Sequence, residues 1–394
     1  MIRSTVLYTE EIDDIELAAE ELLAQASDFK PEENSFGIVF MDAETEYEEL
    51  YEHLIKNWDI PFIGASAIGM LTGSGGYHKS GISIMLLTSS DCRFAVGMTQ
   101  GLSAGNTSEP IREIFEELED ELDHEEIKLV LTFGGKPKVI SGDDIVNAID
   151  ELNKNVKVYG AFASDSFSFN DYQVICNERI ADSEQAFVLM SGNVEPKFLS
   201  VQSLSGKVNF SYEVTKSDGN MVYRLGNGTF MEALKKSGLN VKTGVVVTDF
   251  IQTPFITTFD KPDGTHVEAL RVLTSLNDEN GSGMFLGGIS EGSSLELGLL
   301  NRDDVKETVK NAFDEIFEWI KDEGKDCHTI LCCSCVARFL ALGNNGVIEA
   351  ESYLGRLPKD ISLMGFYSYG EFCPVGSANN CNVFHNYTFT ILCI

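Results

Sequence analysis

Apolar residues recur along this chain at two spacings, which predict amphipathic helices and buried strands in alternation. Helical spacing is found at residues 12–23, 46–57, 109–126, 143–152, 305–320 and 349–354. Runs rich in β-branched and aromatic residues are found at 36–41, 81–87, 93–98, 129–133, 156–159, 267–276, 329–334 and 361–364, and residues 284–300 have the pattern of a hairpin. This alternation predicts a mixed fold, α/β or α+β, with substantial antiparallel pairing.

One unit of this pattern recurs along the chain. It consists of a strand, a helix, a second strand that ends at a glycine turn, and a returning hairpin. The turns read GASAIG from Gly64, GAFASD from Gly160 and GFYSYGE from Gly365. Such repetition predicts pseudo-symmetric α/β layers rather than a solenoid, whose period is shorter. Because glycine has no Cβ, its backbone amides can approach a ligand closely, so we expect these turns to line a binding site.

The length of 394 residues favours two domains of similar size. Residues 207–220 are polar and lack periodicity, which is typical of a connection between domains. We therefore predict two α/β domains with mixed sheets, one over residues 1–212 and the other over residues 213–394.

Several motifs resemble the FIST family of sensory modules in bacterial signalling proteins. They are GASAIG (64–69), GGISEGSSLEL (287–297), SCVAR (334–338), GFYSYGE (365–371) and HNYT (385–388), and they follow the order of the family. The resemblance implies a FIST N-terminal-like domain at 1–212 and a FIST C-terminal-like domain at 213–394. It also implies a non-enzymatic sensor in signal transduction that binds a small ligand, with amino acids and related metabolites as the ligand class. Because the remaining sequence has no room for an output domain, a separate signalling protein is the expected partner.

The chemistry of such a ligand selects candidate residues around the last turn. A carboxylate is bound by a guanidinium, which Arg338 offers, and an ammonium by a carboxylate, which Glu371 offers. Tyr367 and Tyr369 would form an apolar wall with polar tips. The alternative is that these aromatic residues belong to the core and that Arg338 pairs with Glu371 across a hairpin. The full set of candidate ligand-binding residues is Cys335, Arg338, Gly365, Tyr367, Tyr369, Gly370, Glu371, His385 and Asn386, with Gly64, Ser66, Gly160, Ser164 and Asp165 in the N-terminal half.

A cysteine-dependent acyl transferase or hydrolase is the alternative function. Cys335, His385 and Asn386 offer a nucleophile, a base and an orienting amide. Against this reading, the run CCSC at 332–335 alternates like an ordinary buried strand, in which cysteine acts as a small apolar residue. The cysteines at 327–335 also leave redox sensing open. These cysteines lack the paired spacing of a zinc site, so we expect no metal. The sequence GSGGYHKS lacks the glycine that precedes lysine in a phosphate-binding loop, so we expect no cofactor.

The charge of the chain narrows the range of partners. Lys and Arg number 29 against 62 Asp and Glu, which gives a net charge of −33. A surface this acidic repels phosphate backbones and anionic membranes, so we expect no nucleic-acid partner and no membrane insertion. The start of the sequence has neither a signal peptide nor an apolar segment, which predicts a cytoplasmic protein. The nine cysteines show no disulfide framework, and reduced thiols are expected.

Overall fold

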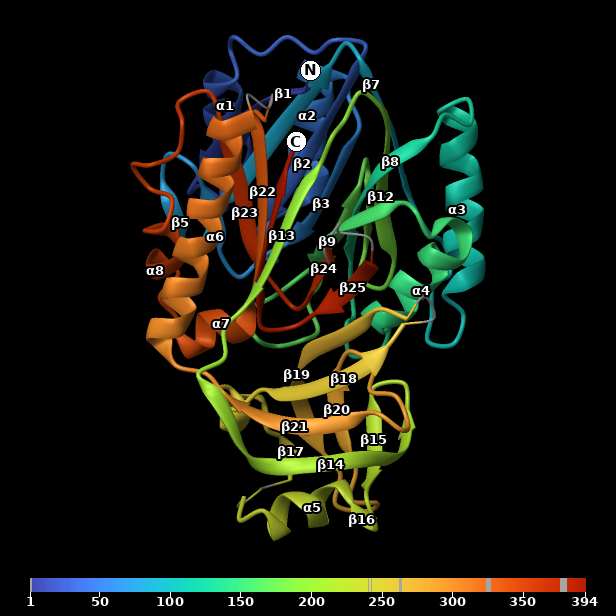
Figure 1. The fold of residues 1–394 in the computed structure, drawn as a ribbon. Helices are drawn as coiled ribbons and strands as arrows, with labels where there is room; N and C mark the ends of the chain where they lie inside the picture. Colours follow the sequence, from blue (N-terminus) through green and yellow to red (C-terminus); the bar gives the residue numbers. More distant parts are fainter. Residues whose placement is uncertain (1, 240, 242, 262–263, 324–326, 376–380) are drawn as a thin grey trace.

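Three six-stranded sheets form the larger part of the structure, here called the body, and a smaller barrel adjoins one end of it (Figure 1). This computed structural model describes residues 2–394 except 240, 242, 262–263, 324–326 and 376–380. Helices and strands alternate along the chain, and the sheets contain both parallel and antiparallel pairs, so the predicted mixed α/β fold is confirmed. None of the described helices is long and apolar enough to cross a membrane.

The three sheets share one strand order. In each, an edge strand pairs with a returning strand, followed by two parallel strands and a hairpin. The first sheet runs β1 (Ile2–Thr9), β6 (Ile82–Ser89), β2 (Asn34–Met41), β3 (Phe62–Ser66), β10 (Val174–Cys176) and β11 (Arg179–Ala181). The second runs β7 (Cys92–Met98), β12 (Gln185–Gly192), β8 (Ile127–Gly134), β9 (Lys157–Phe162), β24 (Glu371–Val375) and β25 (Cys381–His385). The third runs β13 (Lys197–Gln202), β26 (Thr388–Cys393), β22 (Thr329–Cys335), β23 (Ser362–Ser368), β4 (Met70–Thr72) and β5 (Gly76–His78).

The chain follows the same path three times through these sheets. The parallel pairs are β2 with β3, β8 with β9 and β22 with β23, and helical segments connect the strands of each pair. The hairpin that follows each pair leaves its own sheet: β4 and β5 join the third sheet, β10 and β11 the first, and β24 and β25 the second. This cyclic exchange gives the body a pseudo-threefold arrangement and confirms the predicted strand-helix-strand-hairpin repeat.

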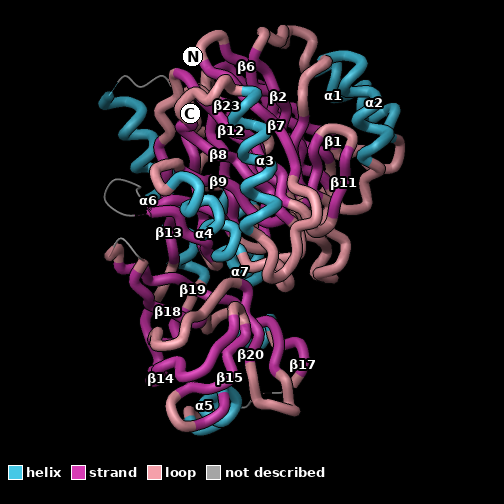
Figure 2. Tube along the Cα trace, turned by 90° about the vertical axis from the view of Figure 1, so that its right-hand side faces the viewer, coloured by secondary structure: helices cyan, strands magenta, loops and turns pink. Residues whose placement is uncertain are grey.

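Helices pack on the sheets of each unit. They are α1 (Ile15–Gln25) and α2 (Tyr47–Trp58) in the first unit, α3 (Ser108–Glu121) and α4 (Gly142–Asn153) in the second, and α6 (Arg302–Glu323), α7 (Val336–Ala341) and α8 (Val347–Ala350) in the third. Figure 2 shows α3 lying across the outside of the second sheet. Its residues Ile111, Phe115 and Leu118 are buried, whereas most of its carboxylates are exposed, so the acidic composition is carried by outward faces.

The barrel is inserted into the third unit, between β13 and α6. Its strands are β14 (Gly206–Asp218), β21 (Ser294–Leu299), β18 (Phe255–Asp260), β19 (His266–Leu276), β20 (Gly283–Leu286) and β15 (Met221–Leu225), and β15 pairs back with β14 to close the ring. The smaller elements are β16 (Gly228–Thr229), α5 (Phe230–Lys236), β17 (Gly244–Val245) and the 3-10 helix η1 (Val247–Phe250). Phe210, Phe230, Phe255 and Phe285 contact one another as its core.

Two expectations for this region differ from the structure. Residues 207–220, expected to be an irregular connection, form β14 and the turn into β15. Only Phe210 and Val214 of β14 are buried, so its hydrophobic pattern is weak. The expected hairpin at 284–300 is also wrong, because β20 and β21 pair with other strands. The domain limit between residues 212 and 213 falls inside β14 and remains a prediction.

Candidate functional site

The three glycine turns occupy equivalent positions in the three units. Across the parallel strands, Gly64 pairs with Val39, Gly160 with Thr132 and Gly365 with Cys332. A Cβ on Gly64 would lie 2.0 Å from the carbonyl oxygen of Val39, and one on Gly160 would lie 1.8 Å from that of Thr132. The close approach of a neighbouring strand therefore requires glycine here, and this is the physical reason for the repeat in the sequence.

The turns meet in the interior of the body. The amide of Ser164 donates a hydrogen bond to the carbonyl of Ser66 (2.9 Å), and Ser66 Oγ donates to the carbonyl of Ser164 (2.9 Å). Ser164 Oγ accepts from the amide of Ile68 (3.0 Å) and donates to the carbonyl of Tyr367 (2.5 Å). One serine side chain thus joins all three turns, so the structure brings together the predicted residues from both halves of the sequence.

Asp165 organises the second turn and holds Tyr369 of the third. Its carboxylate accepts hydrogen bonds from the Tyr369 hydroxyl (2.7 Å), from Ser168 Oγ (2.6 Å) and from the amides of residues 169–171. Burial by itself raises the pKa of Asp165, but these hydrogen bonds outweigh burial and lower the pKa below its ordinary value. The Tyr369 ring stacks on Phe169 at 4.2 Å between centroids. Both predicted site residues therefore have structural partners in the described chain.

Arg338 lies at the start of α7, directly after β22, and its side chain is fully buried. Its Nε donates to Glu349 Oε1 (2.9 Å), its Nη1 to Ser203 Oγ (3.0 Å) and its Nη2 to the carbonyl of Val305 (3.3 Å). The carboxylate partner of Arg338 is therefore Glu349 and not Glu371. Sequence reasoning missed Glu349, because it lies on the short helix α8 with no pattern that links it to Arg338.

Glu349 gathers further polar groups around this ion pair. Its Oε2 accepts hydrogen bonds from Ser334 Oγ (2.7 Å) and from the Tyr367 hydroxyl (2.8 Å). The negative charge of Glu349 and burial both disfavour the tyrosinate form, and burial, the larger cause, raises the pKa of Tyr367 well above its ordinary value. Tyr367 thus acts as a hydrogen-bond donor within the core.

Glu371 lies nearby on β24, opposite His385 of β25. Its carboxyl oxygens accept hydrogen bonds from Ser368 Oγ (2.7 Å) and Thr388 Oγ1 (2.5 Å). Burial raises the pKa of Glu371 to about 8, although the two hydrogen bonds and the charge of Arg338 oppose this rise. The carboxyl group is therefore largely protonated at neutral pH in the folded protein.

We expect Glu371 to make the stability of the protein pH-dependent. The unfolded chain ionises this carboxyl near its ordinary value of 4.5 and the folded protein near 8, so the folded state binds more protons between these values. Stability contributed by this group therefore falls as pH rises from about 4.5 to about 8. Glu371→Gln mimics the protonated acid, and urea unfolding at pH 5 and pH 8 should show the variant gaining stability over the wild type at pH 8. Glu213→Gln, at an exposed position, should show no such gain; an equal difference at both pH values for Glu371→Gln would contradict the assignment.

Cys335, His385 and Asn386 are buried close to this network. Burial raises the pKa of the Cys335 thiol well above its ordinary value, and burial lowers the pKa of His385 to about 4. His385 Nε2 hydrogen-bonds to the carbonyl of Cys373 (3.0 Å), and Asn386 Oδ1 accepts from the amide of Val272 (3.3 Å). A thiolate–imidazole pair is not favoured in this arrangement. The geometry gives no support to the thiol-enzyme alternative.

The barrel packs against the carboxyl end of β22. Cys335 and Tyr387 of the body share an apolar cluster with Val272 and Leu286 of the barrel. The Tyr387 hydroxyl donates to the carbonyl of Phe250 (3.3 Å). The barrel and the polar network are therefore in direct contact.

Arg271, a second fully buried arginine, fixes the barrel to the body and was missed by sequence reasoning. It donates to Asp143 Oδ1 of α4 (3.0 Å), to the carbonyl of Phe384 (3.1 Å) and to the carbonyl of Gly288 (3.1 Å). A Cβ on Gly287 would lie 2.8 Å from Arg271 Nε. Gly287 of the GGISEG motif is thus the sequence signal, since it leaves room for the guanidinium.

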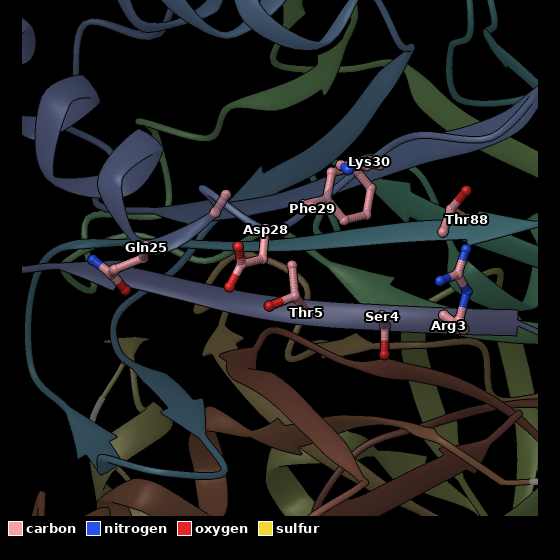
Figure 3. A pocket seen from close by; sticks show the side chains of 9 residues that line it. Arg3, Ser4, Thr5, Gln25, Asp28, Phe29, Lys30 and Thr88 are labelled. Carbon is pink, nitrogen blue, oxygen red and sulfur yellow. The ribbon is translucent and has the colours of Figure 1, made fainter.

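The predicted site residues are brought together, but all of them are buried. Their polar groups bind one another and further buried groups outside the set, such as Glu349, Ser203 and Thr388. A cavity of about 230 Å³ lies elsewhere, beside β1 and the end of α1 (Figure 3). In the part of the chain that the structure describes, no group of three or more His, Cys, Asp or Glu side chains is arranged to hold a metal ion. That these buried residues bind a ligand remains a prediction.

Comparisons with known proteins match most of the chain. The family model described as the FIST N domain matches residues 35–227, and that described as the FIST C domain matches residues 232–374. The two matches meet within the barrel, at β16 and the start of α5. A search of curated proteins gave no match.

Proposed function

Because this chain belongs to the FIST family, whose domains are of a sensory type, we propose that it is a cytoplasmic, non-enzymatic sensor of a small ligand. Amino acids and related metabolites are the proposed ligand class. The ligand binds where the third glycine turn meets the barrel, at Arg338, Tyr367 and Glu371. A change in the position of the barrel then passes the signal to a separate signalling protein.

The contacts of Arg338 carry this proposal. Ser203 precedes the first barrel strand and Val305 follows the last one, so Arg338 hydrogen-bonds to both chain segments that connect the body to the barrel. A ligand that engages this guanidinium therefore acts on a group that is bonded to both segments. The free energy available for the response is the difference between the ligand's affinities for the two barrel positions.

The polar groups around Arg338 supply the chemistry for an amino-acid ligand. Its carboxylate replaces Glu349 on the guanidinium, its ammonium binds Glu371, and the proton that Glu371 gives up neutralises the displaced Glu349 carboxylate. Buried ion pairs contribute little to stability compared with apolar residues of the same volume, and ionisable groups with strongly shifted pKa values gather at functional sites. Both facts support a role beyond stability for this network.

A thermal-shift screen of amino acids and related metabolites tests the proposal. A ligand present at 100 times its dissociation constant should stabilise the fold by roughly 2.7 kcal/mol. Glu371→Gln, which preserves volume and keeps the core neutral, should abolish the stabilisation, and Glu213→Gln on the barrel surface should retain it. Hydrogen exchange of the connecting segments 203–205 and 300–305 should change when ligand is added. The proposal fails if no compound stabilises the wild type, or if Glu371→Gln responds normally.

A further inference from the structure

The cavity in Figure 3 lies in the first unit, at the end of the body away from the barrel. It is bounded by the carboxyl end of α1 and by residues of β1 and β6. Asp28 and Gln25 lie toward one end of it, and Arg3 and Thr88 toward the other, with Lys30 beside Phe29 (Figure 3). Groups of opposite charge are thus separated along the cavity.

The second unit contains a position equivalent to this cavity, and the two positions can be compared. Arg93 of β7 pairs with Ser191 of β12, as Arg3 of β1 pairs with Thr88 of β6. The turns that follow the two helices close in the same way, through hydrogen bonds from the Phe29 amide to the Ala26 carbonyl (2.9 Å) and from the Glu125 amide to the Leu122 carbonyl (3.1 Å). The carboxyl ends of α1 and α3 are therefore structurally equivalent.

In the second unit, the side chain of Arg93 fills this place. Its guanidinium donates to the carbonyls of Glu121 (2.9 Å) and Leu122 (3.2 Å), at the end of α3, and to the carboxylates of Asp123 (2.9 Å) and Glu125 (3.2 Å). A cation is favoured here because the carboxyl end of a helix carries partial negative charge.

In the first unit, the corresponding arginine is turned away. Arg3 forms its ion pair with Glu32. Residues 25 and 26 at the end of α1 then line a cavity instead of an arginine side chain, together with the carboxylate of Asp28, which has no ion-pair partner among the described residues. The end of α1 therefore keeps negative groups that suit a cation, but no arginine side chain in the described part of the chain lies against them.

The other end of the cavity suits an anion. Thr88 is 2% exposed, and its Oγ1 accepts a hydrogen bond from the Glu32 amide (2.8 Å) and lies 2.8 Å from Ser35 Oγ. Arg3 uses part of its five-donor guanidinium on Glu32, and Lys30 is exposed at the edge. A carboxylate here would have the remaining donors of Arg3 and the ammonium of Lys30 within reach.

We propose that this cavity binds a small zwitterion. Its guanidinium or ammonium group occupies the position that Arg93 occupies in the second unit, against Asp28 and the end of α1. Its carboxylate lies beside Arg3, Lys30 and the Thr88 hydroxyl. This is a second site, and it does not depend on the one proposed beneath the barrel.

Calorimetry with 4-guanidinobutyrate, methylguanidinium and butyrate at matched ionic strength tests the proposal. The zwitterion should bind saturably and about tenfold more tightly than either of the two half-molecules. Asp28→Asn and Arg3→Gln should each weaken its binding about tenfold. Asp123→Asn, at the filled position of the second unit, and Glu371→Gln, at the separate site, should leave its binding unchanged.

The variant Arg93→Ala tests whether the two positions are equivalent, because it removes the guanidinium from the end of α3 in the second unit. Millimolar methylguanidinium should raise its melting temperature more than that of the wild type. If this rescue occurs and the wild type still fails to bind 4-guanidinobutyrate, the first-unit site does not exist. If no rescue occurs, the equivalence that supports the proposal is wrong. Binding that survives both Asp28→Asn and Arg3→Gln would also overturn it.

Discussion

Arg338→Ala is expected to lower the free energy of unfolding by about 3–5 kcal/mol, because removing one member of a buried ion pair leaves the other charge buried without a partner. The stranded group is Glu349, which is fully buried. The same change also removes the donors to Ser203 Oγ and to the Val305 carbonyl, which tie down the two connections to the barrel. Urea unfolding, followed by circular dichroism, measures the loss.

Arg356→Ala is the matched control for this variant. Arg356 forms an ion pair with Asp314, but its side chain is 38% exposed, so its removal should cost less than about 1 kcal/mol. The pair substitution Arg338→Met with Glu349→Leu should lose less than Arg338→Ala alone, since no charge is stranded. A loss below about 1 kcal/mol for Arg338→Ala would mean that water reaches Glu349 and that the network is open rather than closed.

The repeated part of the fold could be predicted because its signals are local. Each unit shows helical and strand periodicity over short windows, and the glycines at 64, 160 and 365 recur because each faces the carbonyl of an adjacent parallel strand. The exchange of hairpins between units could not be predicted in this way. Pairing between β4 and β23 joins residues 70–72 to residues 364–366, and no short window carries that information.

The barrel was hidden for a different reason. In β14, Phe210 and Val214 alone are buried, and the polar residues between them face outward, so the strand resembles a connection. The longer interval between Gly160 and Gly365 contains this inserted barrel. An insertion within a repeat lengthens one interval without changing the motifs on either side.

For the candidate site, residue types were informative but burial was not accessible. Serine, tyrosine and glutamate beside a glycine turn are found both in ligand pockets and in fully hydrogen-bonded polar cores. What distinguishes the two is the position of distant partners: Glu349 for Arg338, Asp165 for Tyr369 and Thr388 for Glu371. These partners come from separate segments of the chain, so only the assembled structure reveals that the groups are mutually satisfied.

Gly160→Ala is expected to cost more than about 4 kcal/mol, enough to prevent stable folding in a protein of ordinary stability. The added Cβ would lie 1.8 Å from the Thr132 carbonyl oxygen, which belongs to backbone and cannot rotate away. Gly160 also has a φ of +150°, a conformation that residues with a Cβ rarely adopt. Strands β8 and β9 would have to separate, and the hairpin strand β24, which pairs with β9, would move with them.

The three equivalent glycines give this prediction an internal scale. The Cβ would approach the opposing carbonyl oxygen to 1.8 Å at Gly160, 2.0 Å at Gly64 and 2.4 Å at Gly365, so the losses on substitution by alanine should rank in that order. Gly206→Ala is the control, because its Cβ meets no atom within 4 Å, and its effect should stay within about 1 kcal/mol. Urea midpoints of the four variants measure the ranking. A Gly160→Ala protein that unfolds at the wild-type midpoint would show that β8 and β9 are farther apart than this register allows, and the meeting of the three turns through Ser164 would then have to be revised.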